Sequence, residues 1–324
     1  MTVFNAILLT FWIICPHNKI PMGINIIKNG DDLMFICINL KKAFKTVIGI
    51  IAAVILLVPF IGLIKGRSVS AMAEDKGIFL PAIMYHSVLI EPARQGAYVI
   101  SPKILESDMK WLSDNGYTAV LTDDLTAYTE KGTPLPEKPI MITFDDGFYN
   151  NVTYALPVLE KYGMKAVISP VGSYCEESSE SGDANPAYAY LTWDEIAELK
   201  DSPYIEIGNH TWDMHSTDGR KGSMKKWNES ETEYKAALTG DLSRLQTSLA
   251  EKSGVVPKIY AYPFGYISRE SISVLKELGF KASLNCYEKP NYITRDPDCL
   301  FSINRYNRPA DISTEEFFAR VTAQ

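Results

Sequence analysis

Residues 139–147 read PIMITFDDG, a hydrophobic run that ends abruptly in two carboxylates and a glycine. A short apolar run bounded in this way is consistent with a buried strand. A second segment, residues 210–215, reads HTWDMH and begins where a run of alternating apolar residues, 204–208, ends. Both segments place acids or imidazoles where a strand would emerge at a sheet edge. In α/β folds that edge is where ligands bind.

The side chains in these two segments suit a metal ion. One carboxylate and two imidazoles make three ligands with open positions, as in hydrolytic metal sites, and the other carboxylate is left as a base. Each segment alone has a simpler explanation. Asp-Asp-Gly is common in turns, and histidines five apart do not stack on one helical face, so they need a loop or turn to converge. Because the chain has only four histidines and two lie here, the segments together predict a metal-dependent hydrolase.

The composition is that of a globular protein, with 46% hydrophobic and 22% charged residues among 324. Residues 46–64 are nineteen residues without a charge. As a helix they would span about 28 Å, close to the roughly 30 Å hydrocarbon core of a bilayer. Three lysines lie just before this run, and Lys65 and Arg67 follow it. This slight basic excess upstream favours a single span with a cytoplasmic N-terminus.

We expect four segments: a leader over 1–45, a transmembrane anchor or signal segment over 46–64, a linker over 65–76 and a folded domain over 77–324. Ala71-Met72-Ala73 is similar to a signal-peptidase site. Lys65 and Arg67 separate that site from the apolar run, which favours a retained anchor with the domain outside the cell membrane. Secretion after cleavage near Ala73 is the alternative. Met34 would give a conventional start, so the start at Met1 is suspected to be too early.

Charge also supports a boundary near residue 74. Residues 1–73 hold seven Lys/Arg and two Asp/Glu, a net charge of +5, and the whole chain carries −7, so residues 74–324 carry −12. An acidic domain is a poor binder of nucleic acid, and it would tolerate a polymer that becomes cationic. The acidic surface is equally well explained as one that only keeps the domain soluble. We predict no protein partner. A disulfide among Cys175, Cys286 and Cys299 is not deducible from the sequence.

Strand-like and helix-like segments alternate from residue 77 onward. The strand-like segments are 78–85, 118–121, 140–144, 166–170, 205–208, 258–262, 282–285 and 302–305. Helices are expected after the N-cap residues Ser101, Thr192 and Ser313, and over 152–162, 238–249 and 272–278. Residues 172–189 are expected to form a polar loop at the rim. Seven or eight such units predict an α/β fold, a distorted barrel of parallel strands ringed by helices, with a doubly wound open sheet as the alternative.

At these motifs the chain resembles the polysaccharide deacetylases of carbohydrate esterase family 4, the NodB-homology domain. Residues 143–147, TFDDG, match the first motif of that family in full, and residues 210–215 resemble its second. The longer spacing between the histidines looks like the branch that deacetylates poly-β-1,6-N-acetylglucosamine, and residues 84–88, MYHSV, strengthen that placement. Residues 261–265, AYPFG, resemble the third motif, which lines the groove. The resemblance covers roughly residues 77–310.

The resemblance implies a role for each motif residue. Asp146, His210 and His215 would hold one divalent ion, most plausibly Zn²⁺, although Co²⁺, Ni²⁺ or Fe²⁺ fit the same ligands. Such an ion lowers the pKa of water towards about 7. Asp145 would accept the proton of that water. In the branch named above, the general-acid histidine lies on an N-terminal strand, which points to His86. A strand histidine packed in the core is the simpler reading of His86.

Further residues are implied for substrate binding and support. The backbone N–H of Phe264 would hold the oxyanion by analogy with the family, and Pro263, Tyr262 and Tyr85 would line the groove or the acetyl pocket. Many family members have an arginine where this chain has Ala261. Arg305 could supply that charge to the catalytic aspartate, although a surface or inter-element ion pair is an equal alternative for it.

The resemblance therefore implies hydrolysis of acetamide groups on N-acetylglucosamine residues of an extracellular or cell-wall polysaccharide. Deacetylation of peptidoglycan would use the same chemistry, and the sequence hardly separates the two substrates. A sugar-binding relative with weakened catalysis is a second alternative, because the usual arginine is missing. A different metal hydrolase, such as a phosphoesterase, is disfavoured because those enzymes usually need more ligands or a second metal.

Overall fold

The computed structural model of the chain describes residues 11–13, 22–29, 32–39 and 77–323. The chain divides into two compact units, Met1–Glu74 and Asp75–Gln324. The helix expected over 46–64 and the linker expected over 65–76 lie outside the described residues. Within the described ranges, no helix combines the length and apolar character needed to cross a membrane.

The first unit contains a small antiparallel sheet. Its strands are β1 (Phe11–Ile13), β2 (Met22–Asn29) and β3 (Asp32–Asn39). The central strand β2 pairs with both neighbours, and its pairing with β3 runs from Met22 opposite Asn39 to Asn29 opposite Asp32.

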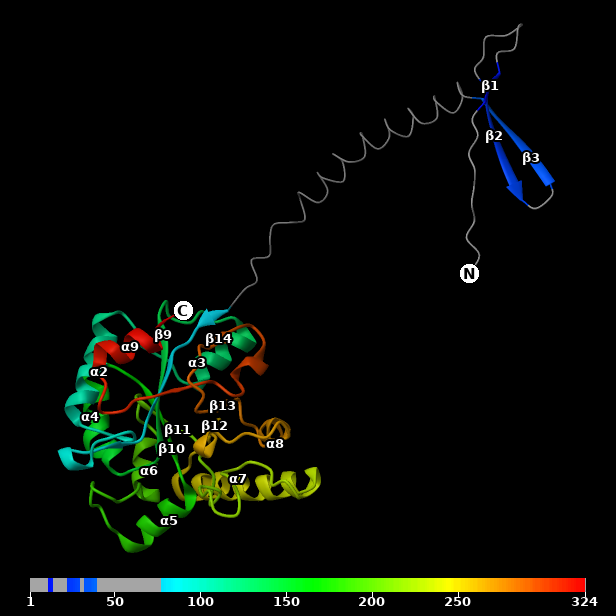
Figure 1. Cartoon of the computed structure of the whole chain (residues 1–324). Helices are drawn as coiled ribbons and strands as arrows, with labels where there is room; N and C mark the ends of the chain where they lie inside the picture. Colours follow the sequence, from blue (N-terminus) through cyan, green and yellow to red (C-terminus); the bar gives the residue numbers. More distant parts are fainter. Residues whose placement is uncertain (1–10, 14–21, 30–31, 40–76, 324) are drawn as a thin grey trace. The chain divides into compact units, whose positions relative to one another are not determined.

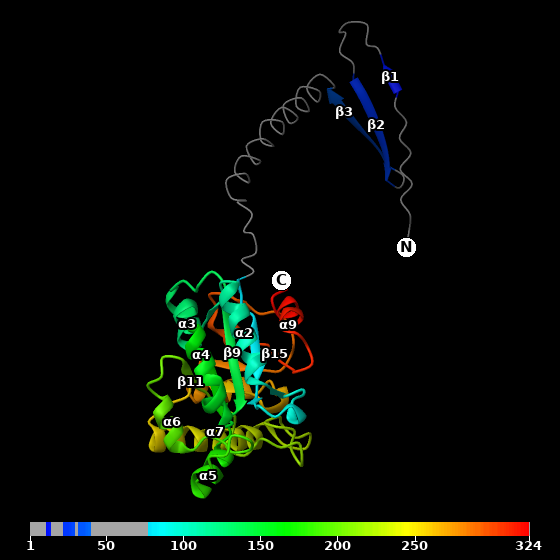
Figure 2. The same cartoon turned by 90° about the vertical axis from the view of Figure 1, so that its left-hand side faces the viewer.

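The second unit is an α/β domain (Figures 1 and 2). Its strands are β4 (Ile78–Phe79), β5 (Ala82–Tyr85), β6 (Ser87–Val88), β7 (Val99–Ile100), β8 (Thr118–Ala119), β9 (Pro139–Asp146), β10 (Ala166–Pro170), β11 (Ile205–Ile207), β12 (Ile259–Ala261), β13 (Ala282–Leu284), β14 (Tyr292–Ile293) and β15 (Tyr306–Asn307). Its α-helices are α2 (Pro102–Asp114), α3 (Thr122–Thr126), α4 (Leu156–Tyr162), α5 (Gly172–Ser181), α6 (Trp193–Leu199), α7 (Glu231–Ser253), α8 (Ser271–Glu277) and α9 (Thr314–Val321). Short 3₁₀ or π segments are η1 (Pro92–Arg94), η2 (Ala127–Lys131), η3 (Asn151–Ala155), η4 (Pro263–Gly265) and η5 (Pro297–Leu300).

Parallel pairings run in a circuit around the domain. Strand β9 pairs with β5 and β10, β10 pairs with β11, and β15 returns to β5. Strands β12 and β13 pair with each other. Single parallel bridges, Asn209 with Tyr260 and Leu284 with Ile303, join this pair to the segments that follow β11 and precede β15. The predicted α/β class with parallel strands is confirmed, and the circuit is that of an irregular barrel with two weak joints.

Strand β9 is the central strand of this arrangement, and both of its faces are covered. Ile140, Met141, Ile142 and Phe144 are fully buried, as expected for a parallel strand with helices outside the sheet. In Figure 1, α2 and α4 lie on one side of β9 and α8 on the other. The strand therefore fixes where its last residues, Asp145 and Asp146, emerge.

Local signals in the sequence fix most helix ends. The Ser101 hydroxyl accepts a hydrogen bond from the Ile104 N–H, and Thr192 and Glu195 form the predicted capping box. Helices α4 and α7 end at Gly163 and Gly254, both with positive φ. These helices confirm the predictions made for them.

Three element predictions were wrong. Residues 172–181 form helix α5 and not a loop; the helix buries Cys175 and Ser178, and its three glutamates favour a helix. The strand expected over 78–85 is broken at Pro81, which has no N–H to donate, into β4 and β5. The last strand lies at β15 instead of 302–305, where only Ile303 makes a bridge. The thiols of Cys175, Cys286 and Cys299 are free.

A buried ionic network ties the C-terminal part of the domain to helix α2. The Asp108 carboxylate accepts hydrogen bonds from Nε and Nη2 of Arg308 at 2.8 and 3.0 Å, from the Thr314 hydroxyl at 2.7 Å and from the Tyr85 hydroxyl at 3.0 Å. Asp108 and Arg308 are 0% and 2% exposed. A buried pair with so many partners is costly to break, because the remaining charge stays buried and unpaired.

We therefore expect Arg308→Ala to lower the free energy of unfolding by about 3–5 kcal/mol, measured by urea denaturation. The matched control is Lys110→Ala, which breaks an ion pair with Asp114 in which both side chains are about 60% exposed. The control should leave the unfolding midpoint almost unchanged. Equal effects of the two substitutions would contradict a structural role for the Asp108–Arg308 pair.

Candidate active site

The residues singled out from the sequence converge on one cavity of about 520 Å³ at the carboxyl ends of the parallel strands. It is lined by Met84, His86, Ser87, Tyr98, Val99, Asp145, Asp146, Phe148, His210, His215, Phe264, Tyr266 and Cys286. Strand β5 delivers His86, β9 delivers the two aspartates, and the turn after β11 delivers the two histidines. This convergence is the expected location of a ligand site in an α/β fold.

Asp146, His210 and His215 form a potential metal site, and it is the one such His/Cys/Asp/Glu group found among the described residues. Their ligand atoms all lie within 4.8 Å of one another. Oδ1 of Asp146 lies 3.6 Å from Nε2 of His210 and 3.1 Å from Nε2 of His215. This oxygen is buried and has no well-formed hydrogen bond. One carboxylate oxygen and two imidazole nitrogens this close together are a set of ligands that suits a divalent ion.

The backbone bends sharply to create this convergence. Asp146 and Thr211 have φ of 70° and 73°, in the left-handed region that residues other than glycine rarely occupy. The bend at Thr211 lies between the two histidines and lets side chains five residues apart face one aspartate. Backbone strain of this kind costs of order 1–3 kcal/mol per residue and persists where the surrounding structure enforces it.

Each histidine is oriented through its other ring nitrogen. Nδ1 of His210 lies 2.8 Å from the carbonyl oxygen of Ala261, so it carries the proton and donates to that oxygen. Nε2 of His210, which lies 3.6 Å from Oδ1 of Asp146, is thus the nitrogen available to a metal ion or to a second proton. Nδ1 of His215 lies 3.3 Å from the hydroxyl of Tyr174 on α5. Contacts of this type fix the tautomer and the ring orientation of metal-binding histidines.

Charges inside the cavity are strongly coupled. Burial raises the pKa of Asp146, but the imidazoles of His210 and His215 outweigh burial and hold that pKa well below its usual range. Burial lowers the pKa of His210, but the carboxylates of Asp145 and Asp146 outweigh it, so this pKa lies above its ordinary value. Without a cation, these groups favour a carboxylate beside a protonated imidazole. A bound cation would take the place of that proton.

Asp145 is held by Arg305 in a buried, two-pronged ion pair. Nη1 and Nη2 of Arg305 donate to Oδ1 and Oδ2 of Asp145 at 2.6 and 2.7 Å. The guanidinium also donates to the carbonyl of Asn285 and the hydroxyl of Thr143, both at 3.0 Å. Burial raises the pKa of Asp145, but the charge of Arg305 outweighs it and keeps the pKa below its usual value. Arg305 thus occupies the supporting position proposed for it from the sequence.

His86 follows strand β5 and lines the cavity. Its Nδ1 is buried without a hydrogen-bond partner in the described structure. Its ring meets that of Tyr98 edge to face, with centroids 4.9 Å apart. Burial lowers the pKa of His86 below its ordinary value. The protonated ring is therefore a stronger acid than free imidazole.

The third motif forms one wall of the cavity. Phe264 has φ of 56°, is 47% exposed and places its ring 4.7 Å from that of His215. Pro263, which was predicted to line the groove, is buried and is not among the residues that line the cavity.

Two tyrosines predicted to contact substrate also do not reach the cavity. Tyr85 is 1% exposed, stacks on Phe144 and donates its hydroxyl to Asp108. Tyr262 is fully buried, and its hydroxyl pairs with that of Ser271. The prediction of direct contact fails for both. Tyr85 is the last residue of β5, where alternate side chains point to opposite faces, and Tyr262 directly follows β12; both side chains are buried in the core.

Three cavity or supporting residues were missed in the sequence. Tyr98 and Cys286 line the cavity, and Tyr174 lies behind His215. Sγ of Cys286 lies 3.8 Å from Nη2 of Arg305. None of the three stands in a recognisable motif, and Tyr174 lies in the segment read as a loop. No sequence signal marked them.

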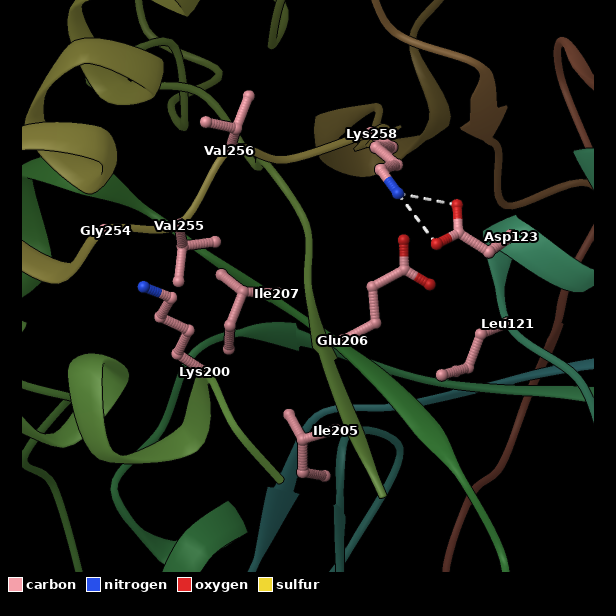
Figure 3. Close-up of a pocket in the computed structure, with 10 residues that line it drawn as sticks. All are labelled: Leu121, Asp123, Lys200, Ile205, Glu206, Ile207, Gly254, Val255, Val256 and Lys258. Atoms are coloured by element: carbon pink, nitrogen blue, oxygen red, sulfur yellow. Dashed lines mark hydrogen bonds and ion pairs between the residues drawn. The ribbon is translucent and has the colours of Figure 1, made fainter. Parts of the chain in front are cut away.

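A second pocket lies near the opposite ends of the strands (Figure 3). It is lined by Leu121, Asp123, Lys200, Ile205, Glu206, Ile207, Gly254, Val255, Val256 and Lys258. Its polar groups largely satisfy one another, since Nζ of Lys258 lies 2.7 Å from both oxygens of Asp123 and Glu206 accepts the Thr122 N–H at 2.9 Å. It holds no histidine and is not a candidate for the chemistry.

Comparison with known proteins agrees with the fold and the site. Residues 132–283 match the family described as polysaccharide deacetylase. This stretch of the chain is a polysaccharide deacetylase domain, and it contains both aspartates of the cavity and the histidines His210 and His215. It is 29% identical over 218 residues, 61% of its length, to a poly-β-1,6-N-acetyl-D-glucosamine N-deacetylase of Escherichia coli K12. It is 26% identical over 194 residues, 59% of its length, to the protein of that name from Staphylococcus aureus MRSA252.

Among solved structures, a de-N-acetylase from Aggregatibacter actinomycetemcomitans superposes with a TM-score of 0.62 at 27% identity. The superposition covers 76% of this chain and 99% of that one. The matched region spans about a third, 32%, of the Escherichia coli relative and 62% of the Staphylococcus aureus relative.

Tyr174→Phe tests the contact behind His215. Loss of the hydroxyl should weaken Zn²⁺ binding about tenfold, at the lower end of the range for such supporting contacts because the 3.3 Å distance is long. The measurement is competition with a chromophoric chelator. Tyr190→Phe is the matched control, since that ring stacks on Tyr174 at 4.5 Å and no hydroxyl contact with a histidine is seen for it. Equal affinities of the two variants would show that Tyr174 does not orient His215.

Proposed function

We propose that residues 77–323 form a hydrolase that removes acetyl groups from N-acetylglucosamine residues of a polysaccharide. The observation that carries the proposal is the juxtaposition at the end of β9. A braced, ionised Asp145 lies directly beside Asp146, which faces His210 and His215. A carboxylate base next to a three-ligand metal site is the apparatus for hydrolysis of an unreactive acyl bond.

The residue roles follow from this geometry. Asp146, His210 and His215 would hold a divalent ion, and Zn²⁺ suits two imidazoles and a carboxylate best, with Co²⁺, Ni²⁺ or Fe²⁺ also compatible. When bound, such an ion supplies Lewis-acid chemistry, acidifying water and polarising an acyl oxygen. Asp145 accepts a proton from the attacking water. The ion pair with Arg305 keeps Asp145 ionised and fixes its orientation.

The remaining groups serve the departing sugar. The backbone N–H of Phe264 stabilises the negative charge that develops on the acetamide oxygen. His86 donates a proton to the leaving nitrogen, because an amide nitrogen is expelled only as a neutral amine. Water and the acetamide thus become acetate and a glucosamine residue. Tyr98, whose ring contacts that of His86, positions the acid.

The substrate proposed is a β-1,6-linked N-acetylglucosamine polymer. The Escherichia coli and Staphylococcus aureus relatives carry the name of enzymes acting on that polymer. The five-residue separation of His210 and His215 and the position of His86 directly after β5 support the same branch. We further propose that residues 46–64 anchor the domain at the outer face of the cell membrane, where an exported polymer is accessible, or that cleavage near Ala73 releases it.

The decisive test is amine release from β-1,6-linked N-acetylglucosamine oligomers and from peptidoglycan glycans by residues 74–324. We expect release from the β-1,6-linked oligomers, loss of release with a chelator and recovery when Zn²⁺ is restored. Asp145→Asn should reduce kcat at least about 10³-fold, since it removes the base. Peptidoglycan preferred over the oligomers would overturn the proposed linkage. No release from either glycan with Zn²⁺, Co²⁺ or Ni²⁺ present would overturn the proposed activity and favour a sugar-binding protein.

Arg305→Lys tests the brace on Asp145. Lysine keeps the charge but cannot make two parallel hydrogen bonds, so kcat should fall about 10- to 100-fold. Zn²⁺ affinity, measured as for Tyr174→Phe, should be almost unchanged, because Arg305 does not contact the metal ligands. A fall in metal affinity matching the fall in kcat would show that Arg305 supports the whole site and not the base alone.

A further inference from the structure

We propose that Trp227 and the segment around it form an aromatic subsite for the acetylated polymer, outside the catalytic cavity. The inference rests on the proposed function, because it concerns how the same cavity receives a long chain. Residues 220–229, RKGSMKKWNE, form the segment around Trp227 and are called the Trp227 loop. It follows the metal-site histidines and precedes helix α7.

Trp227 is exposed to an unusual degree. Its side chain is 97% exposed, whereas the other exposed large hydrophobic residues of the described domain range from 39% to 67%. An indole ring in water forgoes the burial that stabilises most tryptophans. Large rigid aromatic rings held in solvent are typical of surfaces that bind a ligand or partner.

The loop holds the indole outward through a fixed turn. The Glu229 N–H donates to the Lys226 carbonyl at 3.2 Å, and the Lys226 N–H donates to the Glu229 carboxylate at 3.0 Å. Arg220 closes the loop with two hydrogen bonds to Glu229, at 2.6 and 3.0 Å, and one to the Met224 carbonyl at 2.9 Å. The Arg220 and Glu229 side chains are only 15% and 11% exposed. Trp227 is thus presented by an ordered loop.

The same loop packs against the wall of the catalytic cavity. The Lys225 N–H donates to the Ser268 hydroxyl at 2.8 Å, and Nζ of Lys221 lies 5.8 Å from the centre of the Tyr266 ring. Gly222 lies so close to the wall that an added Cβ would fall 2.7 Å from the Pro263 carbonyl oxygen. Tyr266 lines the cavity. The loop is therefore continuous with the third-motif wall, and Trp227 is the most exposed large hydrophobic residue of that loop.

The chemistry of the loop fits an acetylated sugar chain. The flat indole matches the apolar C–H face of a pyranose ring, and Trp contributes contact area with little loss of conformational entropy. Lys221 and Lys226 also give the loop a small basic patch on a domain of net charge −12, whereas the charge of Lys225 is paired with that of Glu270 at 3.4 Å. A deacetylated chain is cationic and would be repelled by this patch, whereas a neutral acetylated chain would not. The loop is thus suited to hold substrate and to release product.

The test compares Trp227→Ala with the native sequence on acetylated β-1,6-linked oligomers of increasing length. We expect the ratio of kcat/KM on long oligomers to that on the shortest one to fall about threefold to tenfold. Tyr292→Ala is the control, because that exposed ring packs on Phe79 away from the cavity, and it should leave the ratio unchanged. The length at which the two proteins diverge counts the sugar rings between the cavity and Trp227.

A binding measurement separates this proposal from the proposed activity. In the Asp145→Asn background, long oligomers should quench a component of tryptophan fluorescence that is absent from the double variant with Trp227→Ala. If the Asp145→Asn variant shows this quenching but the native protein shows no turnover, the result would support the subsite and overturn the proposed deacetylase activity. Equal kcat/KM ratios together with no quenching would overturn the subsite. Loss of binding to anionic phospholipid vesicles in Trp227→Ala, with an unchanged ratio, would assign the loop to a membrane surface instead.

Discussion

The ion pair between Asp145 and Arg305 is the interaction on which the site depends. Both side chains are buried, at 2% and 0% exposure, so each charge would be very costly without the other. Asp145 is the next-to-last residue of the central strand β9, and Arg305 precedes β15, which returns to β5 and closes the circuit of strands. A correctly folded C-terminal part of the domain is therefore a condition for an ionised Asp145. The ionisation of Asp145 and closure of the fold are coupled through one guanidinium.

The rest of the site shows how a rigid scaffold supports strained backbone. Asp146, Thr211 and Phe264 all have positive φ; Asp146 and Phe264 line the cavity, and Thr211 lies between the two cavity histidines His210 and His215 in the chain. Their neighbours are fixed by the parallel pairing of β9 with β10 and by the bridge between Asn209 and Tyr260. The paired strands thus stabilise a strained local backbone that an isolated loop would not keep. The two histidines then receive their ring orientations from β12 and α5, elements on different sides of the cavity.

The sequence was sufficient to predict which acids and imidazoles would meet, but not most of the residues that orient them. The Asp-Asp-Gly segment and the two histidines were sufficient to predict the three ligands that the fold brings together. Tyr174 escaped notice because its helix is rich in serine and glutamate, with two buried side chains beyond its first residue, Cys175 and Ser178. Tyr85 and Tyr262 were misread because adjacency to a motif says nothing about which face of a strand a side chain occupies.

The sequence by itself determined features that depend on neighbouring residues: the capped helix ends, the buried run of β9, and the order of acids and imidazoles along the chain. Only the tertiary structure decided which distant groups meet. Arg305 and Asp145 are 160 residues apart, and Tyr174 and His215 are 41 apart. The physical reason is that capping and strand burial act over a few residues, whereas these contacts exist only after the strands have paired and fixed the direction of every side chain at their ends.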